Sequence, residues 1–273
     1  MKILRKNIKC RVVAAILTIV VSPVFSQDFP VIGAGTGSYM PNHELFSAVL
    51  QTHVHDGLVD YKNLQGDVRF QQYISYLQGI DPDSVKPAEQ LAYWLNVYNA
   101  FMLKYVIEKY PLESVFSTIA YVFKRSTFHK KFVELNGVKY SFNQVEHKII
   151  RPFGEPRIHF ALVCAAQSCP PLRPEAYIAD RLNEQLDDQA RIFLGDERKN
   201  VFDFENKKAR VSKIFDWFRG DFASNKTDLL IYLSQFLPKQ EGEMLKAEAK
   251  RYGVGHFSYN WKLNDASPDD PGK

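Results

Sequence analysis

The stretch PAEQLAYWLNVYNAFMLKYVIEKYP, from Pro87 to Pro111, predicts the helix around which the rest of the chain is arranged. One proline stands in its first turn and the other just beyond its end, two places where a helix accepts proline. Apolar side chains cover most of its circumference: Leu91, Trp94, Leu95, Tyr98, Phe101, Met102, Tyr105 and Val106. This pattern is typical of a central helix that other elements surround.

Two amides interrupt the apolar surface of this helix. Asn96 and Asn99 are three residues apart, so they lie on one face. A buried amide without a partner costs about 1 to 3 kcal/mol, so both side chains need hydrogen bonds. Either they tie the helix to adjacent backbone, or they line a polar pocket and donate to a bound substrate.

A second stretch, EPRIHFALVCAAQSCPP at Glu155 to Pro171, holds the candidate reactive residues. Ile158 to Val163 is an apolar run that only His159 interrupts, which predicts a strand buried on both faces. The following loop begins at Cys164 and closes at Cys169, before two prolines that cannot continue a ladder. We therefore expect Cys164 at the end of an interior strand, in a loop whose small residues let a ligand approach the backbone.

A short helix is predicted just before the cysteine stretch. Ser141 and Gln144 form a capping box that opens the segment VEHKIIR, Val145 to Arg151, which should end at Pro152. This helix carries a carboxylate, an imidazole and a guanidinium within six residues: Glu146, His147 and Arg151. Such a set is suited to orient and charge a catalytic base.

These residues predict a thiol site. We expect Cys164 to be the nucleophile, His147 its base and Glu146 the residue that orients the base. A thiolate beside an imidazolium has a lowered pKa, as a nucleophilic cysteine requires. His159 is the other candidate base, yet in a regular strand it would point to the face opposite Cys164. Arg151 would pair with a carboxylate of the ligand.

The first 26 residues predict a secretory signal peptide. Basic residues open it, Val12 to Val21 is apolar, and Val24 with Ser26 gives the small-residue ending. The apolar run is shorter than the roughly 20 residues that a membrane span needs. We therefore expect an exported protein, periplasmic or extracellular, that begins near Gln27 and has no stable membrane insertion after cleavage.

Removal of that segment changes the net charge. The full chain has 35 Lys and Arg residues against 31 Asp and Glu residues, a net charge of +4. The segment holds five of the basic residues and no acidic one, so the remainder has 30 against 31 and a net charge of −1. A near-neutral protein lacks the clustered basic face that binds phosphates, so no nucleic-acid partner is expected.

Two cysteines remain after cleavage, in a compartment that permits disulfides. The spacing of Cys164 and Cys169 fits neither a CxxC redox motif nor a four-ligand zinc site, so no metal is expected. A disulfide between them, closing one short loop, is the alternative to a free reactive thiol. The sequence has no glycine-rich phosphate loop, EF-hand or HExxH motif, so no cofactor is expected.

The hydrophobic content of 45% and the aromatic content of 14% indicate a globular protein with a substantial core. Asn136-Gly137 predicts a hairpin between Phe132 to Leu135 and Val138 to Tyr140. A second hairpin is expected from Val201 to Phe204 and Ala209 to Ile214, and an extended stretch from His256 to Leu263. Helices are predicted elsewhere along the chain.

We predict a helix-rich α+β single domain, in which the long central buried helix packs on a small mixed sheet. That sheet would contain the two hairpins and the buried cysteine strand. In chain order we expect the signal peptide at 1–26, an extended entry segment at 27–41, the domain at 42–263 and a disordered tail at 264–273.

Four motifs resemble the domain-of-unknown-function family DUF547: YWLNVYNAF at Tyr93 to Phe101, VEHKIIR at Val145 to Arg151, RIHFALVCAAQSCPPL at Arg157 to Leu172, and YNWKLN at Tyr259 to Asn264. The resemblance implies a family and no particular activity. It also marks three residues as motif positions without giving them roles: Glu146, His147 and Arg151. In plant members a cysteine stands at the position of Cys164, whereas the position of Cys169 can hold serine. The resemblance therefore implies that Cys164 need not have Cys169 as its partner.

Three functions stay open at this point. The first is a thiol-dependent hydrolase or acyltransferase that acts on a peptide or amide through Cys164. The second is a non-catalytic module that binds a small thiol-containing or anionic ligand through the same residues. The third is a structural domain in which a Cys164–Cys169 disulfide fixes the loop. In the first two the partner is a small molecule or a peptide, and the oligomeric state is open.

Overall fold

Helix α4 (Gln90–Ile107) lies at the centre of the fold, as its apolar pattern predicts. Only Gln90 and Lys104 of its residues are not buried. A 3-10 turn at Pro87–Glu89 precedes it, which places the proline where its missing N–H costs no hydrogen bond. The structure is a computed structural model and describes residues 37–114 and 127–266.

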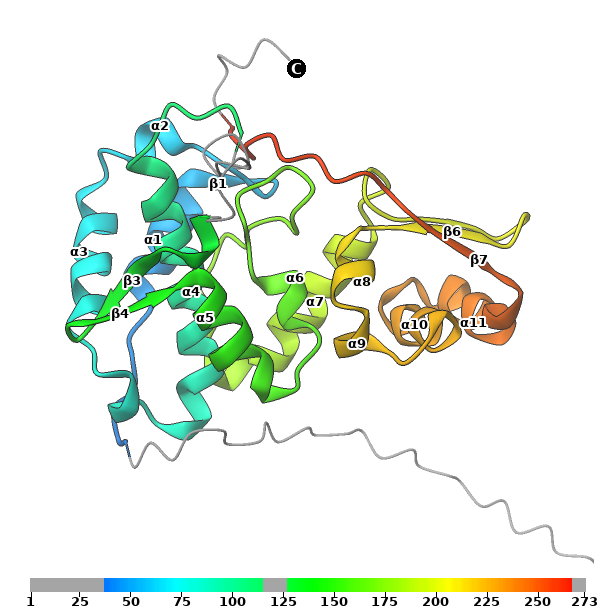
Figure 1. Ribbon diagram of the computed structural model, residues 1–273, viewed down its shortest axis with the longest axis horizontal. Coiled ribbons are helices and arrows are strands. Elements are labelled where there is room, and N and C mark those ends of the chain that lie inside the picture. Colours follow the sequence, from blue (N-terminus) through cyan, green and yellow to red (C-terminus); the bar gives the residue numbers. More distant parts are fainter. Residues whose placement is uncertain (1–36, 115–126, 267–273) are drawn as a thin grey trace, which may run out of the picture.

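The larger lobe consists of helices packed around α4, with two short hairpins (Figure 1). The other helices are α1 (Glu44–His53), α2 (Tyr61–Leu64), α3 (Val68–Gln78), α5 (Phe142–Gln144), α6 (Ile158–Ala161) and α7 (Leu182–Leu194). The antiparallel hairpins are β1 (Val54–His55) with β2 (Leu58–Val59), and β3 (Lys131–Leu135) with β4 (Val138–Ser141). Asn136 and Gly137 both have positive φ, 46° and 76°, so the predicted two-residue turn is confirmed.

The smaller lobe follows α7 in the chain. Its three strands are β5 (Val201–Asp203), β6 (Lys208–Val211) and β7 (Gly253–His256), and its helices are α8 (Ile214–Trp217), α9 (Arg219–Phe222), α10 (Lys226–Leu233) and α11 (Lys239–Glu248). Strand β6 pairs antiparallel with β5 and parallel with β7. The second predicted hairpin is thus confirmed, but in a sheet of its own. The expectation of one mixed sheet that holds both hairpins is wrong.

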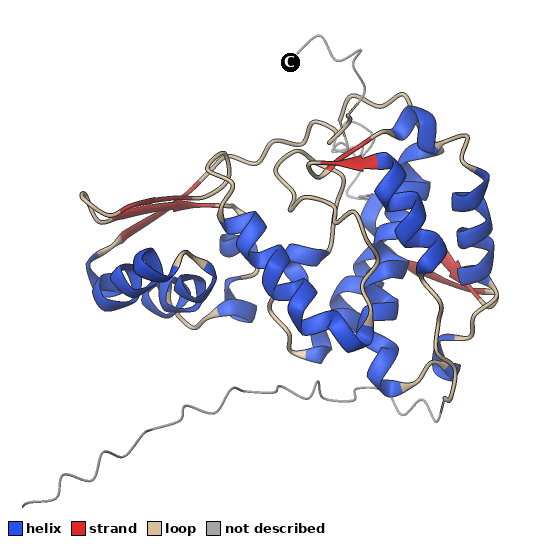
Figure 2. Ribbon diagram, turned by 180° about the vertical axis from the view of Figure 1, so that it is seen from behind, coloured by secondary structure: helices blue, strands red, loops and turns tan. Residues whose placement is uncertain are grey.

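The two lobes share helices α6 and α7. Ile158 and Leu186 belong to the hydrophobic core around α4, whereas Phe160 and Phe193 belong to the core of the smaller lobe. Each of these two helices therefore buries one side in each core. The described residues form one helix-rich α+β domain, as predicted, and helices dominate both lobes (Figure 2).

The predicted cysteine strand is wrong. Ile158 to Ala161 forms α6, and the backbone becomes extended at Leu162, with ψ of 123°. A short apolar run without polar alternation does not distinguish a buried strand from a buried helix. Here Pro156 allows a helix to begin, since the N–H of His159 reaches the Pro156 carbonyl.

The predicted boundary of the disordered tail at residue 264 is also wrong. Asn264 is only 3% exposed, and its Oδ1 accepts a hydrogen bond of 2.7 Å from the Tyr61 hydroxyl. The N–H of Ala266 donates to the Val59 carbonyl, so the ordered backbone reaches at least that residue. The predictions for residues 1–26 and 267–273, and most of the entry segment, lie outside the described residues.

Candidate functional site

The side chain of Asn99 holds the backbone that leads to Cys164. Its amide nitrogen donates to the Ala161 carbonyl at 2.9 Å, and its oxygen accepts from the Val163 N–H at 3.0 Å. A neighbouring strand would have supplied one donor and one acceptor in the same way. The amide thus takes the place of a sheet partner and fixes the cysteine loop directly to α4.

Cys164 and Cys169 are free thiols whose sulfur atoms lie 2.6 Å apart. The N–H of Cys164 donates to the Cys169 sulfur at 2.8 Å. Ala165, between them, has a φ of 64°, which a residue with a side chain rarely adopts, so the backbone turns sharply after Cys164. Cys164 is half-buried and Cys169 is buried, so an external molecule reaches Cys164 first.

A C-terminal segment, residues 257–266, crosses this loop, and we call it the strap. Figure 1 shows it in red, running from β7 back along the top of the molecule to the larger lobe. Its backbone pairs with the cysteine loop: Ser168 N–H donates to Asn260, Gln167 N–H to Lys262, and Asn264 N–H to Ala165. The strap therefore covers the loop that carries both thiols.

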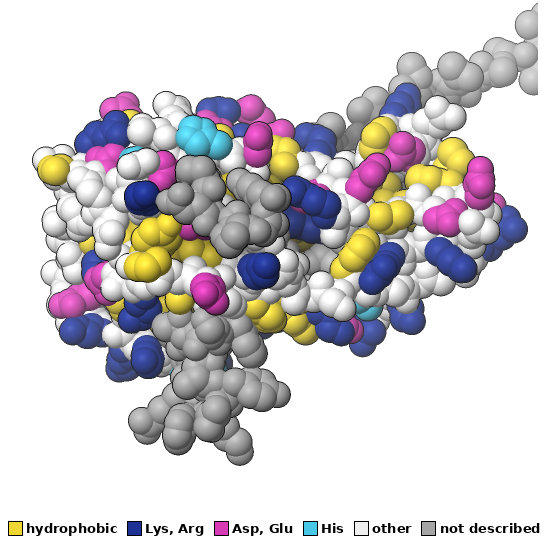
Figure 3. All heavy atoms as spheres, turned by 90° about the horizontal axis from the view of Figure 1, so that it is seen from above, with side chains coloured by type: hydrophobic (Ala, Val, Ile, Leu, Met, Phe, Trp, Pro, Cys, Tyr) yellow, Lys and Arg dark blue, Asp and Glu magenta, His cyan; other side chains and the backbone are white. Residues whose placement is uncertain are grey.

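Tyr259 of the strap brings a hydroxyl to the thiols. Its oxygen lies 3.2 Å from the Cys164 sulfur. Its ring stands beside two tryptophan rings, Trp217 at 4.8 Å and Trp261 at 4.5 Å between centroids, and Trp217 is 46% exposed. Hydrophobic side chains lie in patches among charged ones on the face seen in Figure 3, which looks down on the side along which the strap runs.

The pKa values of the two thiols are shifted in opposite directions. The hydrogen bond with Cys169, followed by burial, raises the pKa of Cys164 well above its ordinary value. Burial acts to raise the pKa of Cys169, but the hydrogen bonds from Cys164 and Tyr259 outweigh it and the pKa is lowered. Lys199 adds a favourable positive charge. The pair therefore loses a first proton readily and holds the second one tightly.

The segment VEHKIIR is helical, as predicted, but it is a π-helix over Val145–Ile150. The capping box before it is present: the Gln144 N–H donates to the Ser141 hydroxyl at 3.1 Å, and the Ser141 N–H to the Gln144 side chain at 2.9 Å. The predicted end at Pro152 is wrong, since a 3-10 turn at Arg151–Phe153 includes that proline. π-Helices are rare and occur frequently at functional sites.

Arg151 joins this helical segment to the smaller lobe. Its Nε and Nη2 donate to the two carboxylate oxygens of Asp221, on α9, at 2.7 and 2.6 Å. Its Nη1 lies 3.0 Å from Nδ1 of His147. A guanidinium can only donate, so Nδ1 of His147 accepts and the ring carries its proton on Nε2. Burial, with the charge of Arg151, lowers the pKa of His147, so the ring is neutral at pH 7.

His159 completes what we call the Asp221 cluster: Asp221, Arg151, His147 and His159. Nε2 of His159 donates to Asp221 at 2.7 Å, and the ring stacks on Phe218 with 4.1 Å between centroids. Burial lowers the pKa of His159 even though Asp221 acts against it. Hydrogen bonds from His159 and Arg151 hold the pKa of Asp221 well below its usual range. One anion and one cation with two neutral rings make the cluster electrically balanced.

Glu146 and Tyr98 form a further pair of polar groups beside the Asp221 cluster. The Tyr98 hydroxyl donates to Oε2 of Glu146 at 3.5 Å. Burial raises the pKa of Glu146 to about 7, against the opposing charge of Arg151. Burial raises the pKa of Tyr98 well above its ordinary value, and the negative charges of Glu146, Cys164 and Cys169 add to the shift. The pKa of Tyr98 therefore responds to the charge of the carboxyl and to that of both sulfurs.

The structure brings Glu146, His147 and Arg151 close to one another, as their spacing indicates. Within the described residues, however, the Cys164 sulfur bonds to Cys169 and Tyr259, and His147 bonds to Arg151 instead. The geometric objection to His159 also falls, because that residue lies on a helix rather than on a strand.

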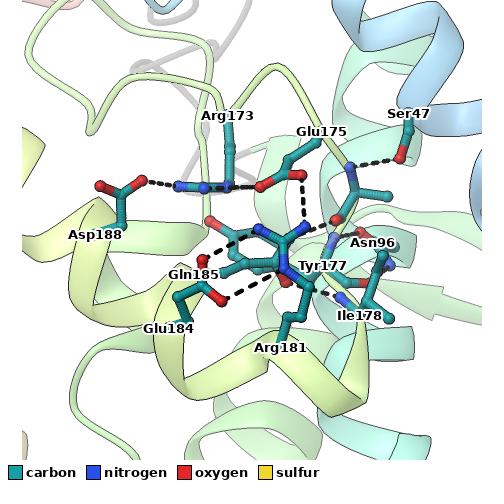
Figure 4. A network of polar contacts seen from close by, with 11 residues as sticks. Ser47, Asn96, Arg173, Glu175, Tyr177, Ile178, Arg181, Glu184, Gln185 and Asp188 are labelled. Carbon is teal, nitrogen blue, oxygen red and sulfur yellow. Dashed lines mark hydrogen bonds and ion pairs between the residues drawn. The ribbon is translucent and has the colours of Figure 1, made fainter.

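Asn96 makes the same kind of contact as Asn99, one turn away. Its amide donates to the Tyr177 carbonyl at 2.8 Å and accepts from the Tyr177 N–H at 2.9 Å. Figure 4 shows this contact beside the ion pairs of Arg173 with Glu175 and Asp188. Both amides thus tie α4 to adjacent backbone, the first of the two alternatives.

Three residues of the site were not predicted from the sequence. Tyr98 and Tyr259 lie in the motifs YWLNVYNAF and YNWKLN, so their motif positions were a usable signal. Asp221 lies in none of the four motifs, and only the packing of α9 against α6 places it beside Arg151.

No three His, Cys, Asp or Glu side chains among residues 37–114 and 127–266 are grouped so that they could hold a metal ion. In the same residues, no helix is both long and apolar enough to cross a membrane. The groups that contact the thiols include the Tyr259 hydroxyl and the Cys164 N–H, and the Lys199 amine donates to the Cys169 carbonyl at 2.8 Å.

Residues 82–194 match the family model described as Protein of unknown function, DUF547. This central part of the chain is a DUF547 region. The match confirms the resemblance and covers three of the four motifs, including both cysteines. The fourth motif, YNWKLN, lies beyond the DUF547 region in sequence but forms the strap over its cysteine loop. The comparisons with curated proteins and with solved structures found no match.

Proposed function

We propose that the chain is an exported thiol–disulfide exchange protein whose reactive groups are Cys164 and Cys169. The observation that carries the proposal is the close approach of the two sulfurs, 2.6 Å apart, which is nearer than two separate thiols pack. Two thiols in contact can be joined by a bond without movement of the backbone. Export would place them in a compartment where disulfides persist.

The contacts favour exchange over hydrolysis or acyl transfer by Cys164. Acyl transfer by cysteine needs a positioned base, usually an imidazole, that takes the thiol proton. The two predicted candidates have other partners, since His147 accepts from Arg151 and His159 donates to Asp221. Exchange needs a second sulfur instead of a base, and the Cys169 sulfur lies 2.6 Å from the Cys164 sulfur.

The reaction balances with a disulfide as oxidant. The Cys164 thiolate attacks one sulfur of the substrate disulfide, whose S–S bond breaks, and the first substrate thiol leaves. The Cys169 sulfur then attacks Cys164, which forms the protein disulfide and releases the second substrate thiol. Two protein sulfurs are oxidised and two substrate sulfurs are reduced. The two protons from the protein thiols end on the two released thiols.

The exposure of the two cysteines supports different roles for them. Cys164 is half-buried and receives the substrate, whereas Cys169 is buried and resolves the mixed disulfide. The hydrogen bonds on Cys169 lower its pKa, so the first deprotonation of the pair falls on Cys169, and its thiolate can take the proton of Cys164 through the contact between the sulfurs as Cys164 attacks.

The test uses glutathione disulfide and the reduced protein, followed by alkylation and mass spectrometry without reductant. The wild-type protein should lose two hydrogens and gain no glutathione. Cys169→Ser should keep one glutathione on Cys164, and Cys164→Ser should react far more slowly. The proposal fails if Cys164→Ser reacts as fast as the wild type, or if the protein isolated from cells holds a disulfide that resists mild reduction, which indicates a structural bond.

A further inference from the structure

Trp217, the last residue of α8, keeps a large aromatic side chain in contact with solvent. It is 46% exposed, whereas Trp94 on α4 is 4% exposed. Among the described residues its ring is part of neither hydrophobic core, and it packs on the strap instead, against Tyr259 and Trp261. The exposed part of an aromatic side chain adds nothing to the burial that stabilises a fold, so this position favours a role in binding.

These three rings, which we call the aromatic cluster, lie beside the sulfur that receives the substrate. The ring of Trp217 is 4.8 Å from that of Tyr259 and 5.9 Å from that of Trp261 between centroids, and the two strap rings are 4.5 Å apart. The Tyr259 hydroxyl lies 3.2 Å from the Cys164 sulfur. The cluster therefore begins at the thiol and extends to the exposed ring of Trp217.

Hydrogen bonds to the strap backbone fix the position of the two strap rings. Between Tyr259 and Trp261, the Asn260 carbonyl accepts from the Ser168 N–H, and the Asn260 N–H donates to the Ser168 hydroxyl at 2.8 Å. The Ser114 hydroxyl donates to the Trp261 carbonyl, also at 2.8 Å. A surface that is already ordered binds a ligand without the entropic cost of ordering a loop.

A substrate joined to Cys164 would have its neighbouring residues over this cluster. In the proposed exchange the substrate cysteine forms a mixed disulfide with the Cys164 sulfur. Consecutive Cα atoms of a polypeptide are about 3.8 Å apart, so a side chain one or two residues from that cysteine reaches the rings. Tryptophan and tyrosine rings pack well with apolar side chains and best with aromatic ones, edge-on or offset.

The charges near Trp217 act against a cationic side chain, the other group that aromatic rings bind. Lys213 pairs with Asp216 at 2.6 Å, so the acid beside Trp217 already has a cation. Arg219, two residues after Trp217 and exposed, adds a further positive charge. A neutral aromatic or apolar side chain therefore suits this surface better than a lysine or an arginine.

We infer that the aromatic cluster is the substrate-recognition site of the exchange reaction, and that the substrate is a polypeptide with an aromatic or large apolar side chain close to its disulfide. This inference rests on the proposed function and names its substrate class. Such side chains are mostly buried in folded proteins, so the cluster directs the thiols to the disulfides of unfolded chains. Trp217 and Trp261 then determine specificity, while the two cysteines carry the chemistry.

The experiment measures the second-order rate constant for exchange of the reduced full chain with two symmetric peptide disulfides, acetyl-Gly-Phe-Cys-Gly-amide and acetyl-Gly-Ser-Cys-Gly-amide. The wild type should react about tenfold faster with the phenylalanine peptide, as one favourable aromatic contact gives. Trp217→Ala should lose most of this preference, because it slows only the reaction with the phenylalanine peptide. Trp217→Phe should keep part of the preference, since it keeps an aromatic ring.

Met244→Ala is the matched control for the loss of an exposed apolar side chain. Met244 is 41% exposed and lies on α11 of the smaller lobe. This variant should keep the wild-type preference between the two peptides. The serine peptide is the control for the strap, because a variant that only loosens the strap over the thiols changes both rate constants by the same factor.

The outcomes separate this inference from the function on which it rests. A wild type that exchanges with neither peptide overturns the exchange function itself. Exchange with both peptides at equal rates overturns only the substrate class. An equal change of both rates in Trp217→Ala means that the ring holds the strap and overturns the recognition site. Self-association of the wild type that Trp217→Ala abolishes, without a preference between the peptides, assigns the surface to a second copy of the chain and also overturns the inference.

The wild-type protein also decides the matter if a variant does not fold. Acetyl-Gly-Phe-Ser-Gly-amide cannot exchange, so it reports binding alone. In ¹H–¹⁵N spectra it should shift the indole signals of two of the three tryptophans and leave that of the buried Trp94 unchanged. The peptide with serine in place of phenylalanine should shift none of them. Indole signals that the phenylalanine peptide leaves in place overturn the inference, whether or not the thiols exchange.

Discussion

The Asp221 cluster and the cysteine pair are both assembled from residues far apart in the chain, yet their polar atoms are satisfied in different ways. Asp221 accepts three hydrogen bonds from fixed donors on Arg151 and His159. In the cysteine pair the two sulfurs contact each other, and the Tyr259 hydroxyl lies beside the Cys164 sulfur.

This difference distinguishes polar groups that stabilise the fold from polar groups that are available to react. A carboxylate with its charge balanced and its oxygens occupied gains nothing by giving up its partners, so the Asp221 cluster holds α9 to the larger lobe. In the cysteine pair, the hydrogen bonds on Cys169 lower its pKa, so the pair loses a proton more readily than an isolated thiol does. We therefore expect substitutions in the cluster to change stability, and substitutions around the pair to change reactivity.

The largest expected effect concerns the amide that supports the cysteine loop. Asn99→Ala leaves the Ala161 carbonyl and the Val163 N–H buried without partners, which should lower the free energy of unfolding by about 4 kcal/mol. It should also speed the alkylation of Cys164 in the native protein, because the loop is no longer fixed to α4. Urea unfolding and iodoacetamide labelling measure the two effects.

Asn96→Ala is the matched control for this change. It removes the same pair of hydrogen bonds, to Tyr177 instead of the cysteine loop, so the loss of stability should be similar. The rate of alkylation should not change. Equal acceleration in both variants would show that general loosening of α4, and not the loop contact, controls the thiol.

The next effect is a pH-dependent gain in stability from Glu146→Gln. The pKa of Glu146 rises in the folded protein from 4.5 to about 7, so the folded state binds its proton more tightly than the unfolded state does. This contribution is fully present below about pH 4.5 and is lost as the pH rises to 7. The variant should therefore equal the wild type at pH 4 and exceed it by up to about 3 kcal/mol at pH 8.

Urea unfolding at several pH values measures this difference. Glu184→Gln serves as a control, because the Glu184 side chain is 69% exposed and its replacement should shift the stability by little at any pH. A Glu146→Gln variant that is less stable than the wild type at pH 8 would mean that the carboxylate has a stabilising partner.

A smaller loss is expected from Asp221→Asn. The amide keeps the shape of the side chain but loses the charge that Arg151 and His159 face, so the free energy of unfolding should fall by about 2 kcal/mol at pH 7. Because the pKa of Asp221 is lowered on folding, this stability is present above the ordinary pKa of an aspartate and is lost as the pH falls further. The variant and the wild type should therefore converge in acid.

Asp216→Asn is the control for this loss, because it removes an exposed carboxylate on the neighbouring helix α8 and should change stability by less than about 0.5 kcal/mol. The reaction of the thiols with a disulfide should be unaffected by either substitution. A large drop in thiol reactivity in Asp221→Asn would contradict the division between the two regions.

The sequence allowed the helical frame to be predicted, because its signals are local. The prolines around α4, the Asn136-Gly137 turn and the Ser141–Gln144 capping box each act over a few residues, and all three formed as expected. Together they fix the central helix, one hairpin and the start of the segment that carries His147.

The thiol environment could not be predicted in the same way. The hydrogen bonds of Asn99, 62 and 64 residues away from their partners, replace the sheet neighbours that the apolar run Ile158 to Val163 indicated. Tyr259 reaches Cys164 across 95 residues. Periodicity carries no information about such contacts, so it did not indicate that a tyrosine hydroxyl would lie beside the Cys164 sulfur.

The smallest expected effect tests that partner directly. Tyr259→Phe removes the hydroxyl 3.2 Å from the Cys164 sulfur and keeps the ring beside Trp217 and Trp261. The hydroxyl acts to lower the pKa of both thiols, so without it alkylation at pH 7 should slow, by about threefold. Tyr252→Phe, which removes a buried hydroxyl without a hydrogen-bond partner, should leave the rate unchanged. If Tyr259→Phe also leaves it unchanged, the strap covers the thiols without tuning them, and the contrast between the two regions rests on the sulfur contact alone.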